Sequence, residues 1–430
     1  MLRITDIQDG CVDWSQVPFC EIEEKDIEKY KLLQNDLVFA RTGATVGKSF
    51  QINIINEISV YASYLIRVRP INDKISDYLK HFFKSSDYWS QITDLSAGIG
   101  QPNVNGSKLK NLKIPLAPEN EQRRIAEKLD TTLARVDALN DRLARITPLL
   151  KRFRQSVLAA ATSGRLTEDW RCSNEIKGLK LGQNILDIPR EWNCDFLGSI
   201  INPSRPLCYG VVQPGEDCST GIPLIRVQDM ERGNVSLCGL RNISEEIDSE
   251  FKRSRVREGD LIISIVGTIG RVALVPKEFH GNIARAIARL SFIEGVITKW
   301  IFYWLQSPEV HWWLVSSSKE VARKTLNLGD LAQLSVALPS SEEQTEIVRR
   351  VEMLFAFADR LEARLQSAQT AAERLTPALL AKAFRGELVP QDPNDEPAAE
   401  LLRSLREARA ADTASKPKRG RAAKAPTVSE

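Results

Sequence analysis

Residues 119–158 read ENEQRRIAEKLDTTLARVDALNDRLARITPLLKRFRQSVL, and residues 341–380 read SEEQTEIVRRVEMLFAFADRLEARLQSAQTAAERLTPALL. In both stretches apolar residues recur at alternating steps of three and four positions, which places them along one face of a helix. A seam sustained over about four heptads has to be buried against another helix. The sequence therefore predicts two long helices that pair with each other. The seam positions are Leu129, Thr132, Val136, Leu139, Leu143, Ile146, Leu150, Phe153 and Val157 in the first stretch, and Val351, Leu354, Ala358, Leu361, Leu365, Ala368, Ala372, Leu375 and Leu379 in the second.

Both stretches carry signals for where a helix begins and ends. Acidic side chains at 119–121 and 342–343 favour helix starts, because carboxylates interact with the exposed amides and the positive end of the helix dipole. Gly164 and Gly386 are placed to stop the two helices. Pro148 and Pro377 each remove one backbone donor, so we expect them to kink or divide the helices. About thirty residues of heptad at a rise of about 1.5 Å give a rod of roughly 45 Å.

The chain is an internal duplication. Glu121-Gln122 returns as Glu343-Gln344, at an offset of 222 residues. Asn105 returns as Asn327 at the same offset, and further upstream the offset drifts to 223 or 224. One unit of about 220 residues therefore occurs twice, with small insertions expected in loops.

The first part of each repeat is rich in short β-strands. Asp36-Leu-Val-Phe-Ala40 and Asp260-Leu-Ile-Ile-Ser264 are β-rich runs that lead to glycine, which is typical of a strand entering a tight turn. Paired aromatic residues at helical spacing follow, and we interpret Tyr78, Phe82 and Phe83 as core residues. The predicted fold class is α+β, with two β-rich domains separated by two long coiled-coil helices and related by the internal duplication.

Composition excludes several classes of protein. Lys and Arg number 59 against 56 Asp and Glu, so a formal net charge of +3 does not by itself indicate nucleic-acid binding. Seven cysteines without a Cys-x-x-Cys pair favour reduced thiols over a disulfide framework or a zinc ribbon. The longest strongly apolar run, Leu261 to Gly270, is about half the length needed to cross a bilayer, and the N-terminus has no signal-peptide pattern. We expect a cytoplasmic protein that does not enter a membrane.

No segment offers a convincing catalytic motif. Residues Gly43 to Ser49 resemble a phosphate-binding loop, but three residues separate the glycines where that motif needs four, and a strand rather than a helix is predicted to follow. The three histidines, His81, His280 and His311, stand in no metal-binding or catalytic arrangement. The sequence therefore predicts no catalytic residue and no metal site.

Two β-rich parts held apart by paired helices suggest a protein that presents two binding surfaces. For DNA, Arg, Lys, Asn and Gln side chains would read base edges and other basic groups would contact phosphates. Such residues gather in the glycine turns and before the helices, although Asn105 and Asn327 could equally cap local turns. The candidate DNA-binding residues are Arg41, Thr42, Lys48, Gln101, Asn103, Asn105 and Lys108 in the first copy, and Arg271, Arg285, Arg289, Arg323, Lys324 and Asn327 in the second.

Three strings make the chain resemble the specificity (S) subunit of type I restriction-modification systems. They are Ile114-Pro-Leu-Ala-Pro-Glu-Asn-Glu-Gln122, Leu149-Leu-Lys-Arg-Phe-Arg-Gln-Ser-Val-Leu158 and Ala381-Lys-Ala-Phe-Arg-Gly-Glu-Leu-Val-Pro-Gln-Asp-Pro393. The resemblance implies two target recognition domains that each read half of a split double-stranded DNA site. It also implies that the two long coiled-coil helices are antiparallel and act as a ruler, with pseudo-two-fold symmetry between the copies. It also implies docking of two methyltransferase (M) subunits and of restriction (R) subunits. Those partners would use S-adenosylmethionine, ATP and Mg, so this chain would bind no cofactor and would not be an enzyme.

The resemblance gives an expected domain organisation. It comprises a first recognition domain at 1–118, a central helix at 119–165, a linker at 166–188, a second recognition domain at 189–340, a C-terminal helix at 341–388 and a disordered basic tail at 389–430. Similarity in the second copy begins near Ile188-Pro-Arg-Glu-Trp192, whereas the first copy begins at Leu2, which matches Ile225. We therefore expect the first domain to lack about 36 residues at its start, and we expect the encoded protein to begin upstream of Met1.

Three alternatives remain open from the sequence alone. A specificity subunit of a fused restriction-methylation system would look alike but would partner a single bifunctional chain. A coiled-coil scaffold with two protein-binding heads would share the helices without binding DNA. An ATPase that uses residues Gly43 to Ser49 is the weakest alternative.

Overall fold

The computed structural model describes residues 1–8, 11–53, 57–70, 72, 74–96, 102–318 and 324–415. The helices are α1 Glu24–Tyr30, α2 Lys74–Phe82, α3 Ser86–Ser96, α4 Gly106–Leu109, α5 Glu119–Thr162, α6 Glu245–Glu250, α7 Thr298–Gln306, α8 Pro308–Ser316, α9 Leu328–Ala332, α10 Ser341–Glu373, α11 Leu375–Phe384 and α12 Ala398–Ser415. The strands are β1 Ile7–Gln8, β2 Cys11–Val12, β3 Leu37–Ala40, β4 Ser49–Gln51, β5 Leu65–Val68, β6 Ile176–Leu181, β7 Asn184–Pro189, β8 Asn193–Phe196, β9 Cys208–Tyr209, β10 Ile222–Ile225, β11 Met230–Glu231, β12 Asn234–Val235, β13 Arg241–Ile243, β14 Leu261–Ser264, β15 Val272–Leu274, β16 Asn282–Ile283, β17 Ile287–Leu290 and β18 Ser335–Leu338.

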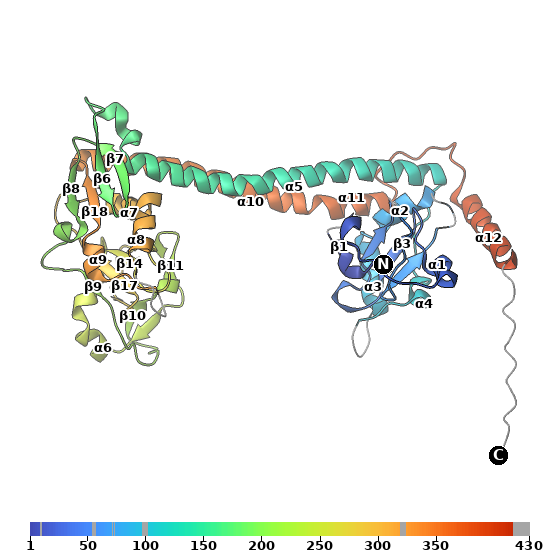
Figure 1. The fold of residues 1–430 in the computed structure, drawn as a ribbon, viewed down its shortest axis with the longest axis horizontal. Coiled ribbons are helices and arrows are strands. Elements are labelled where there is room, and N and C mark those ends of the chain that lie inside the picture. Colours follow the sequence, from blue (N-terminus) through green and yellow to red (C-terminus); the bar gives the residue numbers. More distant parts are fainter. Residues whose placement is uncertain are drawn as a thin grey trace, which may run out of the picture. The chain divides into compact units, whose positions relative to one another are not determined.

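The chain folds into two compact units (Figure 1). Unit 1 comprises residues 1–144 and 366–430, and unit 2 comprises residues 145–365. The long helices α5 and α10 each contribute residues to both units, so unit 1 combines the two ends of the sequence.

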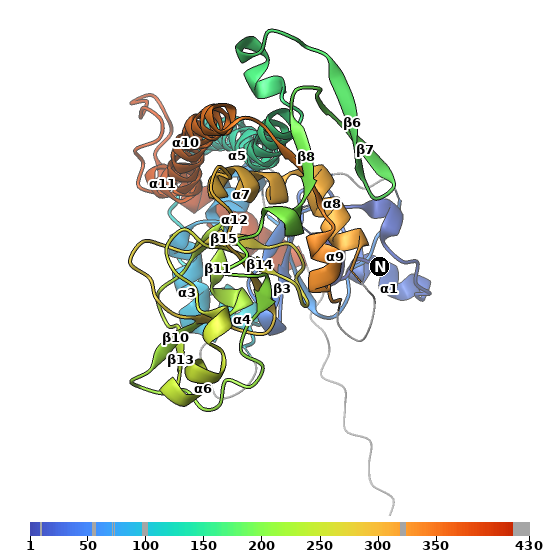
Figure 2. The same cartoon turned by 90° about the vertical axis from the view of Figure 1, so that its left-hand side faces the viewer.

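Unit 2 is built on a four-stranded antiparallel sheet in the order β15-β14-β17-β9. Both β14 and β17 are buried along their whole length, which suits strands covered on two sides. The other strands of unit 2 form a three-stranded sheet in the order β13-β10-β16, the pairs β11-β12 and β18-β8, and the hairpin β6-β7 (Figure 2). Helix α7 presents Trp300 and Trp304, both fully buried, to the apolar cluster that also contains Leu261 of β14.

Unit 1 repeats the central part of this arrangement with the antiparallel sheet β4-β3-β5. Tyr78, Phe82 and Phe83 lie in its core, as the sequence predicted, and the ring of Phe82 meets that of Phe384 at 5.2 Å between centroids. The duplication extends to turns: Arg3 with Asp6 and Arg226 with Asp229 form the same reciprocal capping arrangement.

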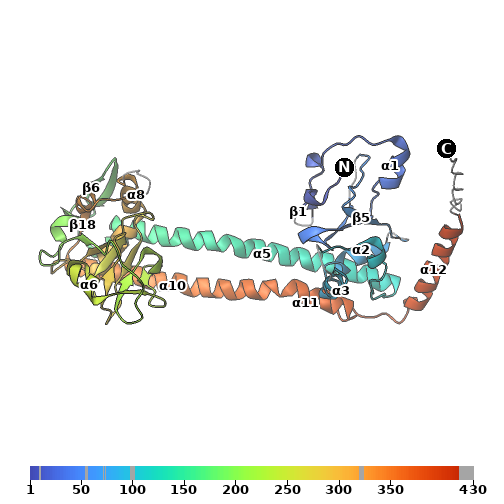
Figure 3. The same cartoon turned by 90° about the horizontal axis from the view of Figure 1, so that it is seen from below.

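The predicted pairing of the long helices is observed inside each unit. In unit 1, Ile125 and Leu129 near the start of α5 share an apolar cluster with Leu380 and Phe384 of α11. In unit 2, the C-terminal part of α5 shares a cluster with the first turns of α10, through Val157, Leu158, Ile347 and Val351. The start of α5 thus meets the end of the second helical stretch, and its end meets the start, which makes the pairing antiparallel (Figure 3). The predicted α+β fold class is confirmed.

The two helix-interior prolines behave differently. Helix α5 continues through Pro148, so of the two expected effects, a kink or a division, this proline does not cause a division. One missing donor leaves the other backbone bonds of a 44-residue helix in place. In the second copy α10 ends at Glu373 and α11 begins at Leu375, with a tight turn in which Arg374 N donates to Ala371 O at 3.2 Å.

Residues after Val389 include an ion pair to α5 and a further helix. Asp395 forms an ion pair with Arg124 of α5 at 2.7 Å, and its side chain is 6% exposed. Helix α12 follows, within the span that the sequence assigned to a disordered tail. The basic stretch from Lys416 onward lies outside the described residues. Within the described residues, no helix is both long and apolar enough to span a bilayer.

His81 is a buried residue of unit 1. It is 3% exposed, its Nε2 lies 2.9 Å from Asp130 Oδ1, and its Nδ1 has no partner in the described structure. Burial lowers the pKa of His81 to about 4, because the loss of hydration outweighs the attraction of Asp130. A second proton would place an unsatisfied N–H at the buried Nδ1.

Replacing His81 should flatten the pH dependence of stability. An unfolded histidine titrates near pH 6.5, so between that pH and about 4 the unfolded chain binds a proton that the folded chain does not. Lowering the pH through this window should cost the wild type about 1.4 kcal/mol per pH unit from this group. Urea denaturation at pH 7, 6 and 5 should show this slope reduced in His81→Gln and unchanged in His280→Gln, where the histidine is exposed. Equal slopes for all three proteins would contradict the assignment.

Candidate nucleic-acid interface

In unit 1 the predicted site residues converge on the turn that follows β3. Thr42 pairs with Asn103 in an isolated antiparallel bridge, and Val104 N donates to Arg41 O at 3.0 Å. This bridge places the turn at residues 41–48 beside residues 103–108. The side chains of Arg41 and Lys48 are exposed and make no hydrogen bond or ion pair with a described residue. Gln101, also predicted here, lies outside the described residues.

Glycine fixes the shape of this turn. Gly47 has a φ of +81°, and a Cβ added there would lie 2.6 Å from a side-chain carbon of Ile92. A single 3-10 turn, Gly43–Thr45, is followed by strand β4. A phosphate-binding loop needs a helix at this point, so the order of elements agrees with the rejection of a nucleotide site.

Two of the predicted residues in unit 1 have local structural partners. Lys108 Nζ donates to Leu95 O at 2.6 Å and to Asn103 O at 3.1 Å. The side chain of Asn105 accepts a hydrogen bond from Lys108 N at 2.9 Å and caps α4. The alternative interpretation of Asn105 as a cap is therefore observed, and Asn103, which is exposed, is the better candidate to contact a ligand.

Unit 2 repeats the same convergence. Val266 pairs with Thr325 in an isolated bridge, and Gly267 N donates to Lys324 O at 2.9 Å. Arg271 is exposed, and its Nη1 donates to the carbonyls of Val227 and Met230 at 3.1 and 3.3 Å. Asn327 Nδ2 donates to Asp330 Oδ2 at 3.2 Å.

Arg285 and Arg323 are two further residues that the sequence predicted in the second copy. Arg285 is exposed, and its guanidinium makes no hydrogen bond or ion pair with a described residue. Arg323 lies outside the described residues. The bridge at Val266 thus brings Lys324 and Asn327 to the glycine turn, as its counterpart does in unit 1.

Arg289 is buried and binds backbone carbonyls of unit 2. It is 3% exposed, and its Nη2 donates to Pro206 O at 2.9 Å while its Nη1 donates to Arg255 O at 3.1 Å and to Arg253 O. Burial lowers the pKa of its guanidinium, and its Nε has no partner in the described structure. Arg67 of unit 1 plays the same part by donating to Lys31 O. The side chain that the sequence offered as a DNA contact therefore holds a loop against the sheet.

Sequence reasoning missed a basic pocket in unit 2. The pocket has a volume of about 710 Å³, and its lining includes Lys252, Arg253, Arg255, Val256, Arg257, Arg205, His280 and Arg289. The signal was the run Lys252-Arg-Ser-Arg-Val-Arg257, which places four cations within six residues. This run begins with a short 3-10 helix, Lys252–Ser254, rather than with a glycine turn, so the glycine-turn pattern does not identify it.

The charges of this pocket are only partly compensated. Arg205 forms a two-point ion pair with Asp260 at 2.6 and 2.8 Å, and Arg255 pairs with Asp248. In contrast, Lys252, Arg253 and Arg257 are exposed and make no side-chain hydrogen bond or ion pair with a described residue. Three uncompensated cations around one concavity favour an anionic ligand.

The Cys208 thiol is a candidate nucleophile, and His, Cys, Asp and Glu side chains are candidate metal ligands. Burial raises the pKa of the Cys208 thiol, although the nearby guanidiniums of Arg289 and Arg253 act in the opposite direction. A neutral thiol is a poor nucleophile. Among the residues that the structure describes, no three His, Cys, Asp or Glu side chains gather as a metal site.

Comparison with known families gives a match in both repeats. The family described as "Type I restriction modification DNA specificity domain" matches residues 15–147 and 216–368. The specificity subunit of the type I restriction enzyme EcoBI from Escherichia coli is 46% identical over 364 residues, covering 82% of this chain and 77% of the relative. The EcoKI specificity subunit from Escherichia coli strain K12 is 31% identical over 439 residues, covering 97% of this chain and 90% of the relative.

Solved structures show the same fold. The crystal structure of the HsdS subunit from Thermoanaerobacter tengcongensis aligns with a TM-score of 0.56 and 19% identity, covering 90% of each chain. A chain from a structure titled for complex assembly and conformational transition of the type I R-M system aligns with a TM-score of 0.56 and 20% identity, covering 83% of each chain.

Replacing Arg289 should test whether its role is structural. Arg289→Met keeps an apolar stem but leaves the carbonyls of Pro206, Arg253 and Arg255 without their donor, which should lower the free energy of unfolding by about 2 kcal/mol or more. Arg285→Met, an exposed control, should change it by less than about 0.5 kcal/mol. Guanidinium denaturation of both variants measures the difference. Equal stability of the two variants would mean that the buried guanidinium is not needed for folding.

Proposed function

The chain belongs to the DNA specificity subunits of type I restriction-modification systems, and from this membership we propose that each β-rich region binds one half of a bipartite duplex DNA target. Members of this family are non-catalytic and supply the DNA specificity of their complex. In this proposal the recognition domains are residues 1–118 and 189–340. The ruler helices are residues 119–165 and 341–388, with residues 166–188 as linker.

The main support for the proposal is that both units contain the same glycine turn, held by an equivalent β-bridge. Thr42 with Asn103 and Val266 with Thr325 hold the same turn against the same segment in two separate units. Exposed cations stand on both turns, Arg41 and Lys48 in unit 1 and Arg271 in unit 2. Two equivalent basic turns suit a target with two half-sites.

The residues divide into proposed base readers and proposed phosphate contacts. We assign Arg41, Asn103, Arg271 and Asn327, with Gln101 and Arg323 from the sequence, to base edges in the groove. We assign Lys48, Arg285, Lys324 and the pocket residues Lys252, Arg253 and Arg257 to backbone phosphates. A pocket of uncompensated cations fits a phosphate better than a base edge, because a phosphate carries a full negative charge.

The helices offer a surface for partner subunits. Within unit 2, Leu149 of α5 is 54% exposed, and Met353 and Phe357 of α10 are 54% and 48% exposed. Large apolar side chains exposed on helices favour a protein partner. We propose that two methyltransferase subunits dock on the helices, that restriction subunits join the resulting core, and that these partners hold S-adenosylmethionine, ATP and Mg.

Domain exchange and helix lengthening should change different properties of the target. Exchanging residues 189–338 for the equivalent domain of another family member should alter one half-site and leave the spacer unchanged. Lengthening both helices by one heptad adds about 10 Å and should lengthen the spacer by about three base pairs. Modification-sensitive sequencing of host DNA, with and without this gene and its methyltransferase partner, reads both outcomes. A spacer that does not change with helix length would argue against the ruler.

The basic pocket predicts a defined change in salt dependence. Lys252→Ala/Arg253→Ala should weaken duplex binding and reduce the slope of log K against log salt by about two, because two phosphate contacts are lost. Lys180→Ala/Lys277→Ala removes two exposed cations of unit 2 that do not line the pocket, and should leave the slope within about 0.5 of the wild-type value. Fluorescence anisotropy with the target duplex between about 50 and 200 mM salt measures both slopes. Equal slopes for the two variants would remove the pocket from the interface.

A further inference from the structure

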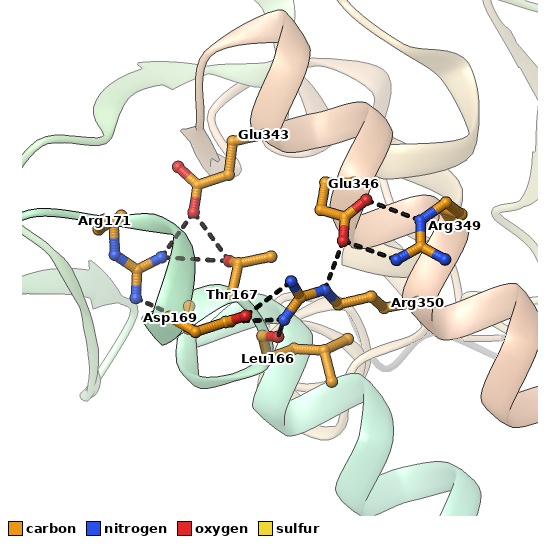
Figure 4. A network of polar contacts seen from close by, with 9 residues as sticks. Leu166, Thr167, Asp169, Arg171, Glu343, Glu346, Arg349 and Arg350 are labelled. Atoms are coloured by element: carbon orange, nitrogen blue, oxygen red, sulfur yellow. Dashed lines mark hydrogen bonds and ion pairs between the residues drawn. The ribbon is translucent and has the colours of Figure 1, made fainter.

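A buried carboxylate in unit 2 joins three parts of the chain. Glu343, near the start of α10, is 7% exposed. Its Oε1 accepts hydrogen bonds from Thr167 Oγ1 at 2.8 Å and from Arg171 Nη1 at 2.5 Å (Figure 4). Its Oε2 accepts a hydrogen bond from the indole Nε1 of Trp192 at 2.8 Å. All of these donors come from the segment between α5 and β8.

The equivalent carboxylate in unit 1 lacks such donors. Glu121 occupies the same position at the start of α5 and is 5% exposed, yet it makes no hydrogen bond or ion pair with a described residue. At the offset of 222 residues the counterparts of Thr167 and Arg171 are Val389 and Pro393, whose side chains cannot donate. Glu121 therefore has no donor that corresponds to Thr167 or Arg171.

The segment that corresponds to β18 forms no strand in unit 1. In unit 2, β18 pairs with β8 so that Ser335 lies opposite Phe196 and Leu338 opposite Asn193. The counterpart of β18 is residues 113–116, which belong to no strand. The backbone groups of Ile114 and Leu116 make no hydrogen bond with a described residue.

The register shows which backbone groups face the vacant edge. Leu197 N donates to Leu334 O, so in this antiparallel pair Val336 and Leu338 exchange bonds with β8, and Ala337 turns away. The Ala337 carbonyl instead accepts from Trp300 Nε1 at 3.0 Å. The counterparts of Val336 and Leu338 are Ile114 and Leu116, so their groups face the edge.

Proline does not block this edge. Pro115 is the counterpart of Ala337, and its carbonyl likewise turns away and accepts from Tyr78 OH at 2.8 Å. Lys113 also faces away, and its N–H and carbonyl are bound by the Gln91 amide at 2.8 and 3.0 Å. The inner side of residues 113–116 is therefore satisfied as in unit 2, and only the outer side is open.

We propose that unit 1 carries an acceptor site for an extended polypeptide segment with the chemistry of residues 189–196. A four-residue strand would pair with residues 113–116, and an indole directly before it would donate to Glu121. Trp192 directly precedes β8, so one short segment makes both contacts in unit 2. That segment is already used there, so the occupant is a separate segment with the same chemistry. Strand addition at an open edge is a known mode of peptide recognition.

A synthetic peptide of residues 186–199, with Cys194 replaced by Ser and a fluorophore at its N-terminus, serves as the probe. Fluorescence anisotropy with the full chain should show saturable binding of one peptide per chain. A Trp192→Phe peptide keeps the ring but loses the indole N–H, and should bind about tenfold more weakly, as should the wild-type peptide to a Glu121→Leu chain. Glu127→Gln, an exposed acid on the same helix, is the matched control and should bind normally.

A second pair of variants tests the strand contact. Ile114→Pro removes a donor that faces the open edge and should abolish binding, whereas Pro115→Ala changes a position that turns away and should leave it unchanged. Circular dichroism confirms that each variant is folded. The proposal is overturned by no binding, by equal binding of a scrambled or Trp192→Phe peptide, or by binding that survives Ile114→Pro. Dimerisation of the chain that the peptide does not reverse would assign the site to a second copy and also overturn it.

Discussion

Neither long helix can bury its apolar seam alone, and this constraint decides which residues make up each unit. Isolated helices gain little stability from local bonds, so the seams require partners. The start of α5 finds α11, and the end of α5 finds the start of α10. Unit 1 is consequently closed by contacts between the two ends of the sequence, such as Arg124 with Asp395. The duplication is what supplies two seams of the same spacing in one chain.

A Glu-Gln pair recurs at both helix starts, and its glutamine anchors the first turn of each helix. In each copy the glutamine donates from its side chain to a carbonyl five residues earlier, Gln122 to Ala117 at 2.7 Å and Gln344 to Pro339 at 3.0 Å. These bonds tie the first turn of each helix to the segment that leaves the β-rich region. Gln344 adds a bond from Ile297 N at 2.9 Å, which links α10 to the segment entering α7. The repeated pair thus fixes how each helix leaves its domain, and the neighbouring glutamate provides the contact that differs between the copies.

The sequence predicted the features that repeat or follow a period. The offset of 222 residues, the helical seams and the buried aromatic residues are all properties of spacing, and spacing is visible in one sequence. Features that depend on which side of a strand faces the core were not accessible. Arg289 lies in a strand whose four residues are all buried, and nothing in its neighbours distinguishes it from the exposed Arg285. The bridge of Thr42 to Asn103 joins residues about 60 positions apart, so it also required the structure.

The net charge of the chain did not indicate the basic pocket, because several acidic side chains are buried while many basic side chains are exposed. Asp36, Asp248 and Asp260 are each no more than 2% exposed, and each binds an arginine inside its own domain. Their charges are cancelled locally and contribute little to the field at the surface. The cations of the Lys252 to Arg257 run outnumber the carboxylates beside them, and three of them remain uncompensated. A balance near zero over the whole chain is therefore compatible with a strongly positive concavity, because burial removes one sign from the surface.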